Sequence, residues 1–171
     1  MKATGIVRRI DDLGRVVVPK EIRRTLRIKE SDPLEIFTDR DGKIILKKYS
    51  PIGELGDFAK EYAQSLAQVS GYTVCIADHD QIIAASGKRA KEYSGKLIDE
   101  ELEVVILNRK TVKLAKKEAV RLTQNDVAGY QSQVISVITS LGDCVGAVII
   151  FSENGETELG ETEIKLAKAA A

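Results

Sequence analysis

Five arginines near the N-terminus are the side chains of this chain best suited to bind a charged partner: Arg8, Arg9, Arg15, Arg23 and Arg24. They lie in a first segment of thirty residues that carries nine basic and four acidic side chains, a net charge of +5. Because the 171-residue chain has 26 basic and 26 acidic residues, the remaining segment carries −5. Guanidinium groups form paired hydrogen bonds with phosphates and guanine edges. The polarised charge therefore predicts a polyanion-binding module at the N-terminus.

The rest of the chain does not indicate an enzyme. The sequence has no P-loop, no G-x-S-x-G and no H-E-x-x-H motif. Its single histidine, His79, lies in the segment DHDQ and is interpreted as a turn residue, with a ligand contact as the alternative. A run of carboxylates is interpreted as the solvated face of a helix and not as an acid/base pair: Asp99, Glu100, Glu101 and Glu103. We expect no catalysis, no cofactor and no metal site.

Both cysteines, Cys75 and Cys144, are flanked by apolar residues. No C-x-x-C motif or histidine cluster accompanies them. We interpret them as buried structural thiols, in preference to a disulfide or a pair of metal ligands.

The elements that must position the arginines occupy about the first fifty residues. Apolar and turn residues predict strands at 5–10 and 15–19, joined by a turn at 11–14 in which Gly14 can take a positive φ. A short helix is expected after Pro19, and two further strands at 34–38 and 43–49 flank the turn DRDG. A body this small is marginal without disulfides, metal or a partner chain. We therefore expect residues 1–50 to form an obligate dimer.

A contiguous motif in this segment carries a family resemblance. GIVRRIDDLGRVVVPKEIRRTLRI, followed by DPLEIF and GKIILKKY, resembles the DNA-binding domain of the AbrB-type transition-state regulators. The resemblance implies that two chains interleave their hairpins into one body, and that Arg8, Arg9, Arg15, Arg23 and Arg24 contact double-stranded DNA. Antitoxins of toxin–antitoxin pairs share this module, so an antitoxin is the alternative function.

A competing interpretation of the arginines is structural. Arg9 or Arg24 could form an ion pair with a neighbouring carboxylate, of which there are three: Asp11, Asp12 and Glu21. For the set as a whole, contact with DNA is favoured, because a dimer would present ten arginines to a phosphate backbone.

Residues 51–56 hold a proline and two glycines and are expected to be a linker to a second domain, 57–171. Helical spacing predicts helices at about 55–70, within 91–110 and from about 160 onward, and apolar runs predict strands at 72–78, 81–87, 111–116, 133–140 and 144–153. This order resembles a GAF or PAS-like α+β sensor domain. The resemblance leaves an unidentified small-molecule ligand open. The fold class expected for the whole chain is α+β.

Together the two domains resemble a family of sporulation regulators from endospore-forming bacteria. The resemblance implies a transcription factor of the developing forespore that both activates and represses genes. No apolar run reaches eighteen residues and no secretion signal is evident, so we expect a cytoplasmic protein that does not enter a membrane. Apolar stripes on the helices at 55–70 and from 160 predict a four-helix bundle with a second copy, and with the N-terminal dimer this gives a homotetramer.

Overall fold

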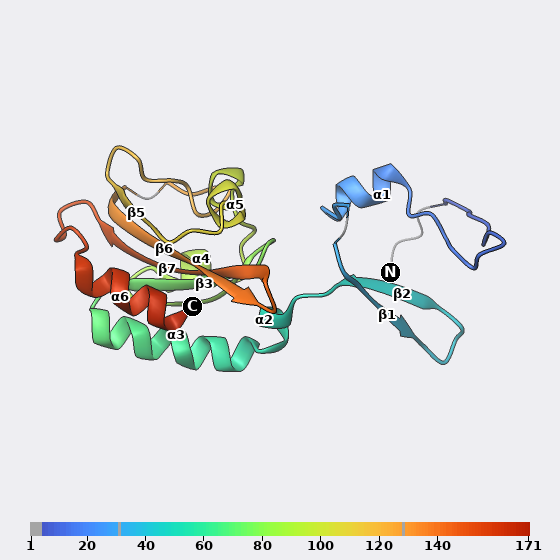
Figure 1. The fold of residues 1–171 in the computed structure, drawn as a ribbon, viewed down its shortest axis with the longest axis horizontal. Coiled ribbons are helices and arrows are strands. Elements are labelled where there is room, and N and C mark those ends of the chain that lie inside the picture. The colour runs from blue at the N-terminus through green and yellow to red at the C-terminus, as the bar shows by residue number, and fades with distance from the viewer. Residues whose placement is uncertain (1–4, 31, 128) are drawn as a thin grey trace. The chain divides into compact units, whose positions relative to one another are not determined.

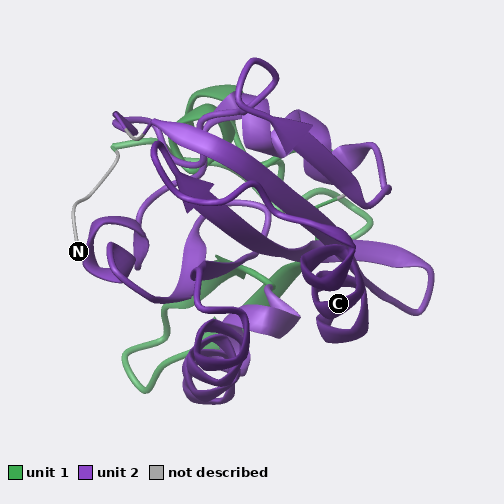
Figure 2. Ribbon diagram, turned by 90° about the vertical axis from the view of Figure 1, so that its left-hand side faces the viewer, with its two compact units in different colours: residues 1–49 green, residues 50–171 purple. Residues whose placement is uncertain are grey.

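The computed structural model describes residues 5–30, 32–127 and 129–171. The chain divides into two compact units, residues 1–49 and 50–171 (Figure 2). Both helices and strands are present, so the expected α+β class is confirmed.

The first unit contains one short helix and one hairpin. Helix α1 (Lys20–Thr25) begins directly after Pro19, whose missing N–H and fixed φ suit a helix start. Strands β1 (Leu34–Thr38) and β2 (Ile44–Lys48) pair antiparallel, with Leu34 opposite Lys48 and Thr38 opposite Ile44. This helix and these two strands confirm the prediction for residues 20–49.

The expected strands at 5–10 and 15–19 are not formed. Both segments run without strand pairing on either side of a turn in which Gly14 has a φ of 76° (Figure 1). A strand requires a neighbour that accepts and donates its backbone hydrogen bonds, and one copy of this chain provides none here. The prediction of four strands was therefore wrong for the single chain.

The first unit also lacks a core. Pro19 is the sole fully buried residue among its described positions. Thirteen large apolar side chains are exposed: Ile6, Val7, Ile10, Leu13, Val16, Val17, Leu26, Ile36, Phe37, Ile44, Ile45, Leu46 and Tyr49. In the β1–β2 hairpin, apolar side chains are exposed on both faces. A two-stranded sheet of this kind is marginally stable in water unless another surface covers it.

The second unit is built on a five-stranded antiparallel sheet in the order β4-β3-β7-β6-β5 (Figure 1). Its strands are β3 (Thr73–Ala77), β4 (Ile82–Ser86), β5 (Val112–Ala115), β6 (Tyr130–Ser140) and β7 (Asp143–Glu153). The two long central strands, β6 and β7, are joined by a tight turn at Leu141 and Gly142. All five strands lie where the apolar runs predicted them.

Helices cover both faces of this sheet. On one face lie α3 (Gly56–Ser70) and α6 (Glu161–Ala170), which pack on a core that includes Val74, Val134 and Ile150. On the other face lie α4 (Ala90–Tyr93) and α5 (Glu100–Leu107), over a second core that includes Ile98, Leu102 and Phe151. Because neighbouring residues of a strand point to opposite faces, buried runs such as those of β3 and β7 serve both cores.

The expected linker at 51–56 is helical instead. Helix α2 (Pro51–Glu54) is capped by Ser50, whose Oγ accepts a hydrogen bond from the Gly53 N–H (3.0 Å) and donates one to Asp78 Oδ2 (2.7 Å). Ile52 is buried against Gly146, where a Cβ atom would lie 2.0 Å from the carbonyl oxygen of Ala77. The cap and this close approach fix the start of the second unit, which composition alone did not indicate.

Candidate nucleic-acid interface

Two of the five arginines lie on α1. Arg23 and Arg24 occupy its last turn, where cations interact favourably with the partial negative charge of a helix C-terminus. Arg23 is half-buried and its Nε donates to the carbonyl oxygen of Val18 (3.2 Å), whereas Arg24 is exposed. The helix therefore holds one guanidinium against the preceding segment and leaves the other in solvent.

Arg8 and Arg9 lie in the extended segment before the first turn, and both are exposed. Arg8 Nη1 donates to the carbonyl oxygen of Val7 (3.2 Å). In the described parts of the chain, neither Arg9 nor Arg24 forms an ion pair with Asp11, Asp12 or Glu21. The competing structural interpretation thus has no support for these two residues.

Arg15 does form an ion pair, which sequence reasoning missed. Its Nε lies 2.8 Å from Asp11 Oδ2 at the end of the first turn. A hydrogen bond from the backbone N–H of Arg15, followed by one from its side chain, lowers the pKa of Asp11. The carboxylate is therefore ionised at neutral pH and opposes the Arg15 charge. An aspartate four residues before an arginine across an Asp-Leu-Gly turn was the available signal.

The predicted thiols and the predicted turn residue lie in the second unit. Cys75 is fully buried and Cys144 is partly buried, and both are free. Burial raises the pKa of each thiol. His79 lies in the bend between β3 and β4, as predicted, and its Nε2 donates to the carbonyl oxygen of Cys144 (2.7 Å). The hydrogen bond joins the bend after β3 to the start of β7, and the raised pKa values keep both thiols protonated at neutral pH.

An aromatic cluster fills the face of the sheet under α4 and α5. The Phe151 ring meets the rings of Tyr93 and Tyr130 edge-on, at centroid distances of 5.2 and 5.1 Å. The two tyrosine hydroxyls lie 3.0 Å apart, and Tyr130 donates to the carboxylate of Asp126. Burial raises the pKa of both tyrosines, and the bond to Asp126 raises that of Tyr130 further. On this face the protein's own side chains pack together between the sheet and the helices.

The segment 120–126 lies over this face and is held by the buried side-chain amide of Gln133. Gln133 accepts a hydrogen bond from the Val120 N–H at Oε1 (2.9 Å) and donates from Nε2 to the Val120 carbonyl oxygen (2.7 Å). Asp126 Oδ2 also accepts from the Leu122 N–H (3.0 Å). Together with the isolated antiparallel bridge between Ile98 and Thr123, these bonds hold the segment over the aromatic cluster, whose three rings are buried.

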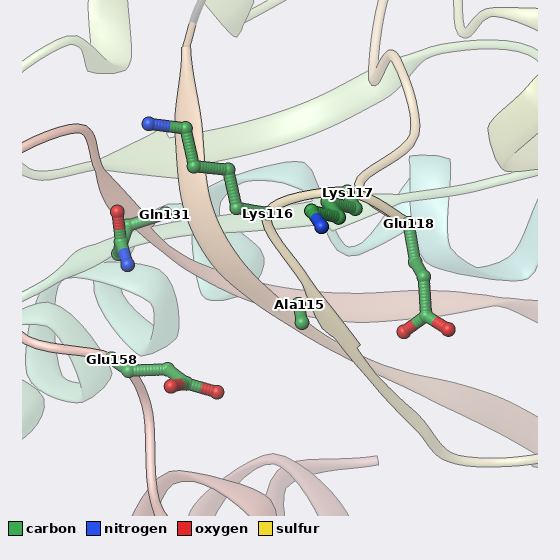
Figure 3. A pocket seen from close by; sticks show the side chains of 6 residues that line it. All are labelled: Ala115, Lys116, Lys117, Glu118, Gln131 and Glu158. Carbon is green, nitrogen blue, oxygen red and sulfur yellow. The ribbon is translucent and has the colours of Figure 1, made fainter.

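A surface hollow of about 460 Å³ lies beside β5 and the start of β6 (Figure 3). Its lining is Ala115, Lys116, Lys117, Glu118, Gln131 and Glu158. Glu158 is already paired with Lys113 (3.0 Å), and the lining carries charges of both signs. With no fully buried polar side chain in its lining, the hollow has no feature that selects a ligand.

Two absences hold for the residues that the structure describes. None of their histidine, cysteine or carboxylate side chains gather in a group of three that could hold a metal ion. Across the same ranges, no helix combines the length and the apolar character needed to cross a membrane.

Comparison with known proteins connects the two units. Residues 54–171 match the family described as stage V sporulation protein T C-terminal, transcription factor. The whole chain is 54% identical to stage V sporulation protein T of Bacillus subtilis (strain 168), over 95% of that protein. The chain belongs to the stage V sporulation protein T family. Residues 7–54 also match the family described as antidote-toxin recognition MazE, bacterial antitoxin.

Each unit has relatives outside the stage V sporulation protein T family. Over 51 residues, 30% of this chain, the sequence is 69% identical to the transition state regulatory protein AbrB of Bacillus subtilis (strain 168) and covers 52% of that protein. The crystal structure of the GAF domain from an Acinetobacter phosphoenolpyruvate-protein phosphotransferase is similar, with a TM-score of 0.55, 12% identity, and coverage of 72% of this chain and 79% of that one. The first likeness confirms the predicted AbrB-type segment, and the second confirms the GAF-like fold alone.

Proposed function

We propose that this protein is a sequence-specific DNA-binding regulator that activates and represses late sporulation genes. Residues 1–50 bind the DNA and residues 57–171 form the regulatory domain. Membership of a transcription-factor family supports this function, as does the 69% identity of the first segment to AbrB. The observation that carries the DNA-contact set is the row of arginines at the surface of a unit whose first thirty residues carry a charge of +5.

The contact residues in this proposal are Arg8, Arg9, Arg15, Arg23 and Arg24. Each phosphate contact releases a counterion, so its loss lowers affinity and flattens the dependence of log affinity on log salt by about one unit, counted twice in a dimer. Alanine variants, measured on duplex DNA across a salt series, test the set. Lys91→Ala in α4 is a control from the second unit, away from the helices proposed to join two copies. Affinity and slope unchanged in all five arginine variants would remove the set.

The proposed regulator is a homotetramer. Two copies pair through residues 1–50, because the exposed apolar side chains of the first unit need a cover. A second interface joins the α3 and α6 helices of two copies. Part of the apolar stripe expected there is buried inside the unit, namely Leu66, Leu159 and Ala167. Leu55 and Phe58 of that stripe are exposed, and the stacked rings of Phe58 and Tyr62 support a contact surface on α3.

An antitoxin remains the second candidate, because residues 7–54 match an antitoxin family. Antitoxins neutralise their toxin with a segment that folds on the toxin surface, and such a segment lacks a core of its own. Residues 50–171 have two cores on one sheet, which favours the regulator. Co-purification of the full chain with a stoichiometric toxin, released by denaturant alone, would favour the antitoxin.

We place the protein in the cytoplasm of the forespore and assign it no catalytic activity, cofactor or metal. Its regulatory domain acts by changing the contacts between copies. We propose that binding of an unidentified small molecule causes this change. The anchored helix α2 supports a mechanical connection, since Ser50 and Ile52 attach the start of this domain to β3 and β7. Mass analysis of the natively purified protein tests whether a small molecule is retained.

A further inference from the structure

One carboxylate organises the first turn of the N-terminal unit. Asp11 Oδ1 accepts hydrogen bonds from the backbone N–H groups of Leu13 (3.0 Å) and Arg15 (2.8 Å), while Oδ2 accepts from Arg15 Nε (2.8 Å). Two backbone bonds close the same turn, from Asp11 N to the Arg15 oxygen and from Gly14 N to the Asp11 oxygen, both 3.0 Å. The main chain and the side chain of Arg15 are thus both fixed by Asp11.

The second turn of the unit, at 39–43, repeats this geometry with different chemistry. Asp39 Oδ1 accepts from the N–H groups of Asp41 (3.0 Å) and Lys43 (2.9 Å), and Oδ2 accepts from Lys43 Nζ (3.0 Å). The glycines of the two turns have φ values of 76° and 77°. The chain therefore contains the same five-residue turn twice, once ending in arginine and once in lysine.

Lys43 and Arg15 differ in the N–H donors that remain for another acceptor. The Lys43 ammonium is also paired with Asp41 Oδ2 (2.6 Å), so two carboxylates surround one point charge. The first turn has Leu13 at the equivalent position, and its carboxylate contact uses Arg15 Nε alone. A guanidinium has five N–H donors, so the four on its Nη atoms remain for another acceptor. Arg15 is 68% exposed, which leaves this fork open to solvent.

We propose that Asp11 is a positioning residue for DNA recognition, which holds Arg15 through Nε so that its two Nη groups meet a phosphate or a guanine edge in a fixed orientation. This rests on the proposed DNA contact by Arg15. A fixed fork loses less side-chain entropy on binding. The carboxylate also repels DNA backbone wherever the fork finds no matching acceptor, and such repulsion raises specificity more than affinity.

The test measures the ratio of affinities of the full chain for two duplexes. One is selected by the wild-type protein from a random pool, and the other is a scrambled sequence of the same length. Asp11→Asn keeps an oxygen for the Leu13 and Arg15 N–H groups but removes the ion pair. We expect it to bind the scrambled duplex more tightly, and to lower the ratio by about tenfold, since a well-oriented bidentate contact discriminates by that order. Asp39→Asn in the matching turn is the control and leaves the ratio unchanged.

Two variants of Arg15 complete the test of positioning and of DNA contact. Arg15→Lys makes the first turn resemble the second, keeps its charge and its fold, and is expected to lower the ratio as Asp11→Asn does, even if Asp11→Asn proves unstable. Arg15→Ala separates the two claims. If it lowers the ratio while Asp11→Asn does not, the positioning role is overturned and the DNA contact stands, whatever Arg15→Lys does, because Arg15→Lys removes the fork itself. An unchanged ratio in Arg15→Ala overturns both the contact and the positioning.

Discussion

The two units of this chain differ in the burial of their apolar side chains. In residues 50–171, both faces of a five-stranded sheet are covered by helices, and residues such as Ile135 and Phe151 have no exposed surface. In residues 1–49, apolar side chains such as Val7 and Ile44 are 84% and 70% exposed. The second unit completes its fold within one chain. The first unit has the apolar amino acids of a folded domain but leaves them exposed in one chain, and we propose that a second copy buries them.

The largest expected effect is a loss of stability in the second unit, residues 50–171. Phe151→Ala removes a ring that contacts Tyr93 and Tyr130 in the buried cluster, and we expect it to lower the free energy of unfolding by about 3–5 kcal/mol. Phe37→Ala removes the same ring from the first unit, where the side chain is 40% exposed in one chain. Denaturant unfolding of the second unit checks the comparison, because its midpoint should not respond to Phe37→Ala. Equal shifts in both variants would contradict the division into independent units.

Protein concentration provides the second test. If two copies complete the first unit, a hundredfold increase in concentration stabilises residues 1–50 by about 2.7 kcal/mol. Thermal melts over this range, together with sedimentation, measure the effect. A midpoint independent of concentration, with a monomeric mass, would mean that no second copy covers the exposed side chains.

The buried hydrogen bonds that link Tyr93, Tyr130 and Asp126 form a hydroxyl chain in the second unit, and its loss is expected to have a smaller effect on stability. Tyr130→Phe removes the group that donates to Asp126 and contacts the Tyr93 hydroxyl, so we expect a loss of about 1–3 kcal/mol through unpaired buried polar atoms. Tyr49→Phe, at an exposed position of the first unit, is the matched control. Thermal melts of the full chain give both values. If Tyr130→Phe were as stable as the control, the hydroxyl chain would not contribute to stability.

The smallest expected effect depends on pH. A hydrogen bond from Lys88 is the main cause that lowers the pKa of Glu156. The stabilisation is therefore present above the unfolded-state pKa of about 4.3 and is lost as pH falls through the lower folded-state pKa. We expect Glu156→Gln to be less stable than the wild type at pH 7, by less than about 1 kcal/mol, and this difference to shrink as pH falls through the folded-state pKa. Glu118→Gln, at an exposed position after β5, is the control. A difference that grew toward low pH would contradict this sign.

The sequence predicted the second unit better than the first, and the reason is physical. Every strand of the second unit was foreseen, because apolar runs such as that of β7 have their hydrogen-bond partners in the same chain. The segments 5–10 and 15–19 carry an equally apolar pattern, but their partners are absent from one chain. The helical residues 51–54 were missed because Gly53 and Gly56 indicated a linker, although Ser50 at the cap and Pro51 at the first position are a local signal for a helix start.

The residues of the candidate interface can be selected by type from the sequence, but their contacts within the chain were not predicted. A cluster of arginines is visible as charge, whereas the pairing of Arg15 with Asp11 follows only from the spacing of an aspartate and an arginine around the Gly14 turn, a signal that was overlooked. The repeat of that turn at 39–43 was also missed, since the two segments, DDLGR and DRDGK, share only an aspartate, a glycine and a final cation. Spacing of side chains around a positive-φ glycine was the signal that could have revealed it.

Amide hydrogen exchange of the full chain tests most directly the central claim that a second copy completes the first unit. At a concentration where the assembled protein dominates, residues 5–10 and 15–19 should exchange as slowly as β1 and β2, because they gain strand partners from the other copy. Dilution to monomer should remove that protection and leave the sheet of the second unit protected. Fast exchange of both segments in the assembled protein would contradict the account.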